Sequence, residues 1–194
     1  MKTTKQNLLL ASILLAGSSA HALASGNSSH MEITGRTSQP IGHFLYCKQY
    51  VDDCNIISQS ANVVKLTRTR WKDLVEINNF SNNTVTPVTD FEAYNKEEHW
   101  TYPTKFGDCE DFVLMKRHLL MQRGWPASAL LITVVLQPNG EGHAVLTVRT
   151  DKADYILDNL DGHIKPWNQT PYTYLKRQDV NNSGHWAQIK DYRT

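Results

Sequence analysis

The sequence predicts an α+β domain in which an antiparallel sheet packs on one buried helix. The helix is predicted over residues 108–123, where apolar side chains occupy most of the helix circumference. Three short apolar or alternating segments follow at residues 130–136, 143–150 and 155–158, with turn residues between them. Because strands joined by short turns pair antiparallel, we expect these segments to form a meander that encloses the helix.

The composition indicates a single globular domain. The chain has 194 residues, of which 40% are hydrophobic and 20% charged, so it can build a hydrophobic core of its own. With only 10 glycines, no sustained heptad and this apolar content, the collagen, coiled-coil and long disordered classes are excluded. The sequence has no basic patch that would indicate a nucleic-acid partner.

The first residues are typical of a cleavable secretory signal peptide, predicted over residues 1–24. Lys2 and Lys5 precede an apolar run at residues 8–16, and an Ala-Leu-Ala site follows, with a cut after Ala22 as an alternative. An uncleaved anchor is the other alternative, but the apolar run is shorter than the roughly 20 residues that span a bilayer. We therefore expect a periplasmic or secreted protein.

The rest of the chain is predicted to contain a leader and one domain. Removal of the signal takes away two of the 20 Lys and Arg and none of the 19 acids, which leaves a net charge near −1. Residues 25–38 are rich in Ser, Gly, Asn and Thr and are expected to be a flexible leader. Residues 39–194 are expected to form the folded domain.

The three cysteines predict one disulfide and one free thiol. In an oxidising compartment, Cys47 and Cys54 are the expected bridge because they lie seven positions apart, whereas Cys109 lies far downstream. A metal site of His43, Cys47, Cys54 and Asp53 is the alternative, although the paired spacing of a structural zinc site is missing. Cys109 is therefore the single thiol.

A second helix and a long loop are expected before the central helix. Apolar residues recur at helical spacing over residues 66–80, and an Asn-rich segment followed by Pro87 ends the pattern. Residues 86–105 contain two prolines among mixed polar residues and are predicted to be a loop.

The central helix is expected to begin with a reactive group. Asp108 is a suitable N-cap, and Gly124 ends the helix, so Cys109 lies in the first turn. The free N–H groups and positive potential of a helix N-terminus stabilise a thiolate and the oxyanion of a tetrahedral intermediate. An inert buried thiol is the alternative for an isolated cysteine.

A histidine and an aspartate are predicted to lie side by side on the two following strands. If the residue numbers of each cross-strand pair sum to about 301, His143 lies opposite Asp158 and Val145 lies opposite Ile156. The carboxylate then orients the imidazole and stabilises its protonated form. Together with Cys109, this arrangement supplies a nucleophile, a base and an orienting acid. A purely structural His–Asp pair at a strand end is the alternative.

Three segments carry a resemblance to a known family: GDCEDFVLMKRHLLMQRGWP, GEGHAVLTVRT and YILDNL. The chain resembles the bacterial transglutaminase-like cysteine proteinases from about residue 44 to residue 186, including the PVTD segment at residues 87–90. This resemblance implies a papain-like/transglutaminase-like fold, with Cys109, His143 and Asp158 as the catalytic triad. The resemblance to periplasmic members of the family further implies a large surface adhesin as the substrate, a regulatory receptor in the inner membrane, and calcium beside the active site.

By the same resemblance, Asp108 and Glu110 are the expected calcium ligands, and no organic cofactor is expected. A physical argument points the same way, because Asp108, Glu110 and Asp111 surround Cys109 and their charge should raise the pKa of its thiol. A hard cation would relieve this repulsion. The alternative is that these acids simply stabilise the first turn of the helix.

The expected chemistry is acyl transfer through a thioester. With water as the acceptor, the protein is a cysteine endopeptidase, which is the function the resemblance favours. With an amine as the acceptor, it is a transglutaminase or amide acyltransferase. A non-catalytic binding module on the same fold is an alternative of a different class.

Overall fold

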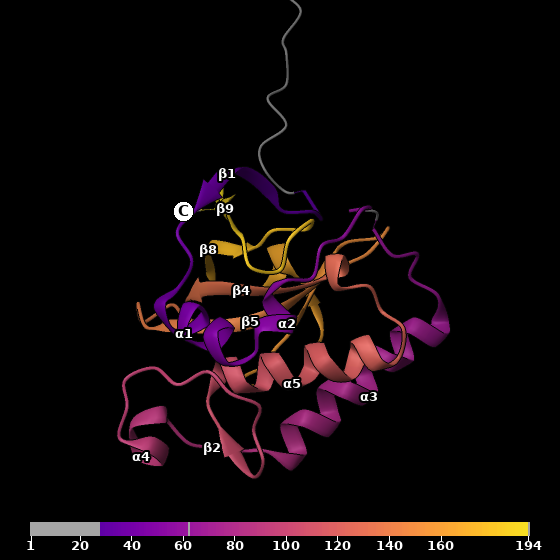
Figure 1. Ribbon diagram of the computed structural model, residues 1–194. Coiled ribbons are helices and arrows are strands. Elements are labelled where there is room, and N and C mark those ends of the chain that lie inside the picture. Colours follow the sequence, from indigo (N-terminus) through magenta and orange to yellow (C-terminus); the bar gives the residue numbers. More distant parts are fainter. Residues whose placement is uncertain (1–27, 62, 194) are drawn as a thin grey trace, which may run out of the picture.

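The computed structural model describes residues 28–61 and 63–193. Its main feature is a seven-stranded antiparallel sheet with the order β1-β9-β8-β4-β5-β6-β7. Two long helices, α3 and α5, pack on each other, and α5 packs on strands β4 and β5 (Figure 1). The expected signal peptide, residues 1–24, lies outside the described residues.

The strands of the main sheet are β1 (Glu32–Thr37), β4 (Leu130–Leu136), β5 (Gly142–Arg149), β6 (Asp154–Leu157), β7 (Lys165–Pro166), β8 (Thr173–Gln178) and β9 (Trp186–Lys190). A second, parallel pair consists of β2 (Thr86–Pro87) and β3 (Phe106–Gly107). The helices are α1 (Ile41–Gln49), α2 (Val51–Cys54), α3 (Arg68–Thr84), α4 (Asp90–Tyr94) and α5 (Cys109–Gln122), with 3₁₀ turns at Ala127–Ala129 and Trp167–Gln169. Within the described ranges, no helix has the length and apolar character that a membrane crossing requires.

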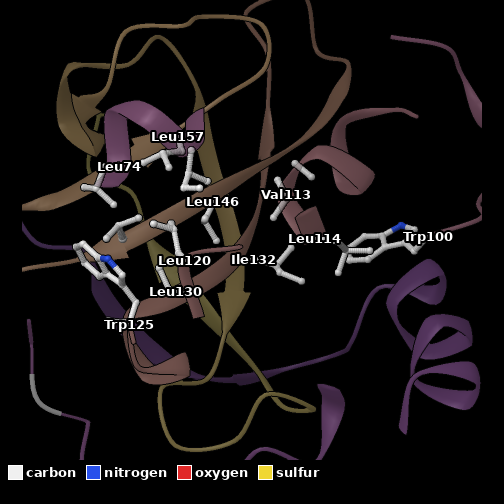
Figure 2. Packing of buried hydrophobic residues seen from close by; sticks show 14 of the residues in the cluster. Leu74, Trp100, Val113, Leu114, Leu120, Trp125, Leu130, Ile132, Leu146 and Leu157 are labelled. Carbon is white, nitrogen blue, oxygen red and sulfur yellow. The ribbon is translucent and has the colours of Figure 1, made fainter. Parts of the chain in front are cut away.

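The sheet separates two clusters of buried side chains because successive residues of a strand point to opposite faces. One cluster lies between the sheet and helix α5, and Figure 2 shows Leu120 of the helix among Leu130, Leu146 and Leu157 of the strands. The second cluster lies on the other face and consists of Met31, Val135, Val145, Ile156, Trp167, Tyr172, Tyr174 and Ile189. The central helix is enclosed, as expected from its all-round apolar pattern.

Helix α5 begins at Cys109, and Asp108 occupies the N-cap position. The side chain of Asp108 makes no capping hydrogen bond, however, so the expectation that this residue caps the helix through its carboxylate is wrong. Its Oδ1 atom is buried without a hydrogen-bond partner among the described residues. This oxygen is therefore available for another interaction at the helix start.

The register of β5 and β6 differs from the expected one by two residues. Leu146 pairs with Leu157 and Thr147 with Ile156, so the residue numbers of each pair sum to 303. His143 therefore does not lie directly opposite Asp158. A shift of two positions keeps every side chain on its face of the sheet. His143 and Asp158 therefore remain on one face and meet diagonally, which is within reach of such side chains.

Two other segments differ from their expected structure. The expected flexible leader contains β1, which pairs with β9, and Met31 just before it is buried. The expected loop at residues 86–105 contains β2 and α4, and α4 begins with a capping box between Thr89 and Glu92. The exposed side chains of β1 explain why no hydrophobic pattern marked it.

Candidate active site

His143 and Asp158 form a buried, hydrogen-bonded pair. The Nε2 atom of His143 lies 2.8 Å from Oδ1 of Asp158, and both side chains are almost fully enclosed. His143 comes from the start of β5, and Asp158 directly follows β6. Because Nε2 faces the carboxylate, Nδ1 is the ring nitrogen left to exchange a proton with a nucleophile.

Asp158 receives two further hydrogen bonds. The hydroxyl of Tyr172 donates to Oδ2 at 2.5 Å, and the backbone N–H of Leu160 donates to Oδ1 at 3.0 Å. Burial acts to raise the pKa of Asp158, but the bonds from His143, Tyr172 and Leu160 overcome it and hold the pKa below its usual value. The acid therefore remains ionised and can orient the imidazole.

Cys109 occupies the first position of α5, half-buried, beside the start of β5. Its thiol donates a hydrogen bond to Oε2 of Glu110 at 3.1 Å, and the backbone N–H of Ala144, the residue after His143, interacts with the sulfur. Burial raises the pKa of the thiol, and the charges of Glu110 and Asp108 raise it further. This confirms the expected direction of the effect of these carboxylates.

A cluster of three carboxylates lies next to the thiol. Asp90, Asp108 and Glu110 offer oxygen atoms that lie within 4.8 Å of one another. Burial raises the pKa values of Asp108 and Glu110, and the neighbouring negative charges of the cluster raise them further. Together with the unpartnered Oδ1 of Asp108, this donor set fits a hard divalent cation such as Ca²⁺.

Asp90 is the member of this cluster that the sequence did not predict. It is the first residue of α4, 18 positions before Asp108, and it also accepts a hydrogen bond from the backbone N–H of His99. Asp111 is not part of the cluster. Its carboxylate accepts a hydrogen bond from the backbone N–H of Thr101 at 2.8 Å, which ties the preceding loop to α5.

The expected bridge between Cys47 and Cys54 is present, with an S–S distance of 2.04 Å. His43 lies beside it, fully buried, and the indole N–H of Trp186 donates to its Nδ1 at 3.2 Å. Asp53 accepts hydrogen bonds from two tyrosine hydroxyls instead of facing the sulfurs. Because the two sulfurs are bonded to each other, the alternative metal site is not formed in this structure.

Known proteins resemble this chain in family and in fold. The family model for bacterial transglutaminase-like cysteine proteinases matches residues 33–194. The calcium-bound form of LapG from Legionella pneumophila matches with 25% sequence identity and a TM-score of 0.50, over 59% of this chain and 67% of LapG.

The EGTA-treated form of the same LapG matches with 21% identity and a TM-score of 0.52, over 79% of this chain and 84% of LapG. A search of curated proteins found no match. These structural matches confirm the expected α+β, transglutaminase-like fold.

Proposed function

Because this chain belongs to the bacterial transglutaminase-like cysteine proteinases and is therefore a cysteine peptidase, we propose that Cys109, His143 and Asp158 form its catalytic triad. The observation that carries this assignment is the buried hydrogen bond between Nε2 of His143 and Asp158, together with the contact of the Cys109 sulfur with the backbone N–H of the next residue, Ala144. The start of α5 adds backbone N–H groups that can stabilise an oxyanion.

In the proposed reaction, Nδ1 of His143 accepts the proton of the Cys109 thiol, and the thiolate attacks the carbonyl carbon of a peptide bond. The N–H groups at the start of α5 stabilise the oxyanion that forms. The imidazolium then donates its proton to the leaving amine, and a thioester remains on Cys109. Water, deprotonated by His143, hydrolyses the thioester to a carboxylic acid and restores the thiol.

The thiol in the present structure bonds to Glu110, so it has to turn toward His143 before it reacts. We propose that Asp90, Asp108 and Glu110 hold a Ca²⁺ ion and that Glu110, used as a ligand, no longer accepts the thiol proton. When bound, Ca²⁺ supplies the positive charge that offsets three neighbouring carboxylates. The calcium-bound LapG structure, at 25% identity, supports this proposal.

The natural substrate is proposed to be a large secreted adhesin, cut in the periplasm or outside the cell after export by the signal peptide at residues 1–24. An inner-membrane receptor that sequesters the protease is proposed as its regulator. The substrate and the receptor come from the family resemblance, whereas the export comes from the signal-peptide pattern of the sequence.

The proposed function is tested by incubating wild type and Cys109→Ala with candidate secreted adhesins, followed by N-terminal sequencing of any fragment. Cleavage by wild type alone supports the proposal, and equal cleavage by Cys109→Ala overturns the assignment of the nucleophile. A parallel assay with a fluorescent amine separates the two acyl acceptors, because labelled product without cleavage would indicate a transglutaminase. Active-site titration with a peptide ester tests the binding-module alternative, which predicts no acyl-enzyme on Cys109.

Calcium binding is tested by calorimetric titration of CaCl₂ into wild type, Glu110→Gln and Asp90→Asn. Asp52→Asn is a matched control, because Asp52 is exposed and lies outside the cluster. Binding by wild type and by the control, with loss in the two cluster variants, supports the proposal. Equal heats for all four proteins, or an alkylation rate of Cys109 that is the same in chelator and in millimolar calcium, would overturn it.

A further inference from the structure

Each oxygen of the Asp158 carboxylate has its own donors. His143 and the backbone N–H of Leu160 bond to Oδ1, whereas the hydroxyl of Tyr172 bonds to Oδ2. Among the described residues, Tyr172 is the one hydrogen-bond donor to Oδ2. Because Asp158 is only 3% exposed, loss of this bond would leave a charged oxygen buried without compensation.

Tyr172 also contacts the other partner of the pair. Its ring centroid lies 5.5 Å from that of His143, at an interplanar angle of 56°. Tyr172 is 8% exposed and belongs to the core cluster on the face of the sheet opposite α5. One side chain therefore covers the imidazole with its ring and holds the carboxylate with its hydroxyl.

We propose that Tyr172 is a positioning residue of the triad, which fixes the orientation of Asp158 and covers the hydrogen bond between His143 and Asp158. This inference rests on the proposed function, because it assigns Tyr172 to the same site. With Oδ2 held by Tyr172, the carboxylate cannot rotate without breaking a second, charge-assisted hydrogen bond. Oδ1 then stays directed at Nε2 of His143, which keeps Nδ1 directed at the nucleophile.

A buried tyrosine that only fills the core would behave differently, and the chain offers a matched control. Tyr174 is two positions further along, is 2% exposed and belongs to the same cluster. Its hydroxyl bonds to Oγ1 of Thr170 at 2.9 Å and not to the triad. Removal of either hydroxyl takes one oxygen from the same core, but only the hydroxyl of Tyr172 is hydrogen-bonded to Asp158.

The experiment compares Tyr172→Phe and Tyr174→Phe with wild type in kcat, KM and the urea midpoint. We expect Tyr172→Phe to lower kcat about 5- to 30-fold with little change in KM, since the lost interaction acts on a general base rather than on substrate binding. Tyr174→Phe should leave kcat within about two-fold of wild type, because its hydroxyl does not contact the reacting groups. Equal kcat values for both variants would overturn the proposal.

A second readout does not depend on turnover. In the Cys109→Ala background, the NMR signal of the proton held between Nε2 of His143 and Asp158 should move in Tyr172→Phe, because Asp158 has lost the donor at its other oxygen. Tyr174→Phe should leave this signal at its wild-type position, because its hydroxyl bonds to Thr170. An unmoved signal in Tyr172→Phe would overturn the positioning role. A wild-type protein without peptidase activity would instead refute the proposed function.

Discussion

Nε2 of His143 lies 2.8 Å from Oδ1 of Asp158 although the two residues are not cross-strand partners. The bond is diagonal, from the second residue of β5 to the residue that follows β6. Its geometry depends on the carboxylate, because an amide can present a donor to the imidazole and favour the wrong tautomer.

Asp158→Asn is therefore expected to lower kcat/KM by roughly 10²- to 10⁴-fold without unfolding the protein. The measurement is peptide cleavage at several substrate concentrations, with circular dichroism to verify the fold. Asp161→Asn is the control, because Asp161 is a nearby loop acid that bonds to Lys165 and His163 instead. Similar losses in the two variants would contradict the assignment of Asp158.

The sequence predicted this pair because alternation along a strand determines the face on which a side chain lies, even where the register is wrong. The two-residue error arose at the turn after Thr150. The hydroxyl of Thr150 accepts hydrogen bonds from the N–H groups of Lys152 and Ala153, which places Asp151 and Lys152 in the turn. The position of this turn could have been predicted from Thr150, since Ser and Thr side chains commonly stabilise turns in this way.

Other parts of the site left weaker signals. Helix α4, which carries Asp90, begins with Thr89 and Glu92 in the spacing of a capping box, a pattern that is visible in the sequence. Tyr172 has no such motif, because it reaches Asp158 from the connection before β8 and its role depends on tertiary packing. The edge strand β1 is exposed along nearly its whole length, so hydrophobic periodicity could not reveal it.

Gly107, two residues before Cys109, is expected to tolerate no side chain. A Cβ atom there would lie 2.7 Å from Cβ and Oδ2 of Asp111, whose carboxylate connects α5 to the preceding loop. Gly107→Ala should therefore displace the start of α5 and cost about 1 to 3 kcal/mol of unfolding free energy, as overpacking does. Urea unfolding and peptide cleavage measure both effects.

Gly142→Ala is the matched control for this prediction. Gly142 directly precedes His143, and a Cβ atom there would meet no other atom within 4 Å. Its activity and urea midpoint should remain close to those of wild type. If Gly107→Ala is as active and stable as Gly142→Ala, the close packing at the start of α5 is not required.

The bridge between Cys47 and Cys54 is expected to stabilise the fold modestly. It closes a loop with a sequence separation of 7, and a loop this short corresponds to about 2.5 kcal/mol in the chain-entropy model. The double variant Cys47→Ala/Cys54→Ala should lose about this amount in urea unfolding, and a reducing agent should then have no further effect. Cys109→Ser keeps the bridge and should lose the stabilisation that the bridge provides only when reductant is added.

Lys116 is expected to make the stability of the protein depend on pH. It is fully buried in α5, and its Nζ atom has no hydrogen-bond partner among the described residues. Burial lowers the pKa of Lys116 to about 7 from an ordinary value of 10.5, although the negative charge of Asp158 acts in the opposite direction. Below pH 7 both the folded and the unfolded chain carry this proton, so the full cost of the buried charge applies.

Between pH 7 and 10.5 the unfolded chain binds the proton and the folded chain does not, so this residue makes stability rise with pH by up to about 1.4 kcal/mol per pH unit. Lys116→Met lacks this group and should exceed wild type in unfolding free energy at pH 6, with a difference that shrinks toward pH 10. Urea unfolding at five pH values from 6 to about 10 measures the difference directly. Lys152→Met, at an exposed site, should show no such trend. A constant difference between Lys116→Met and wild type across this range would mean that Lys116 keeps the same protonation state in the folded and unfolded chains.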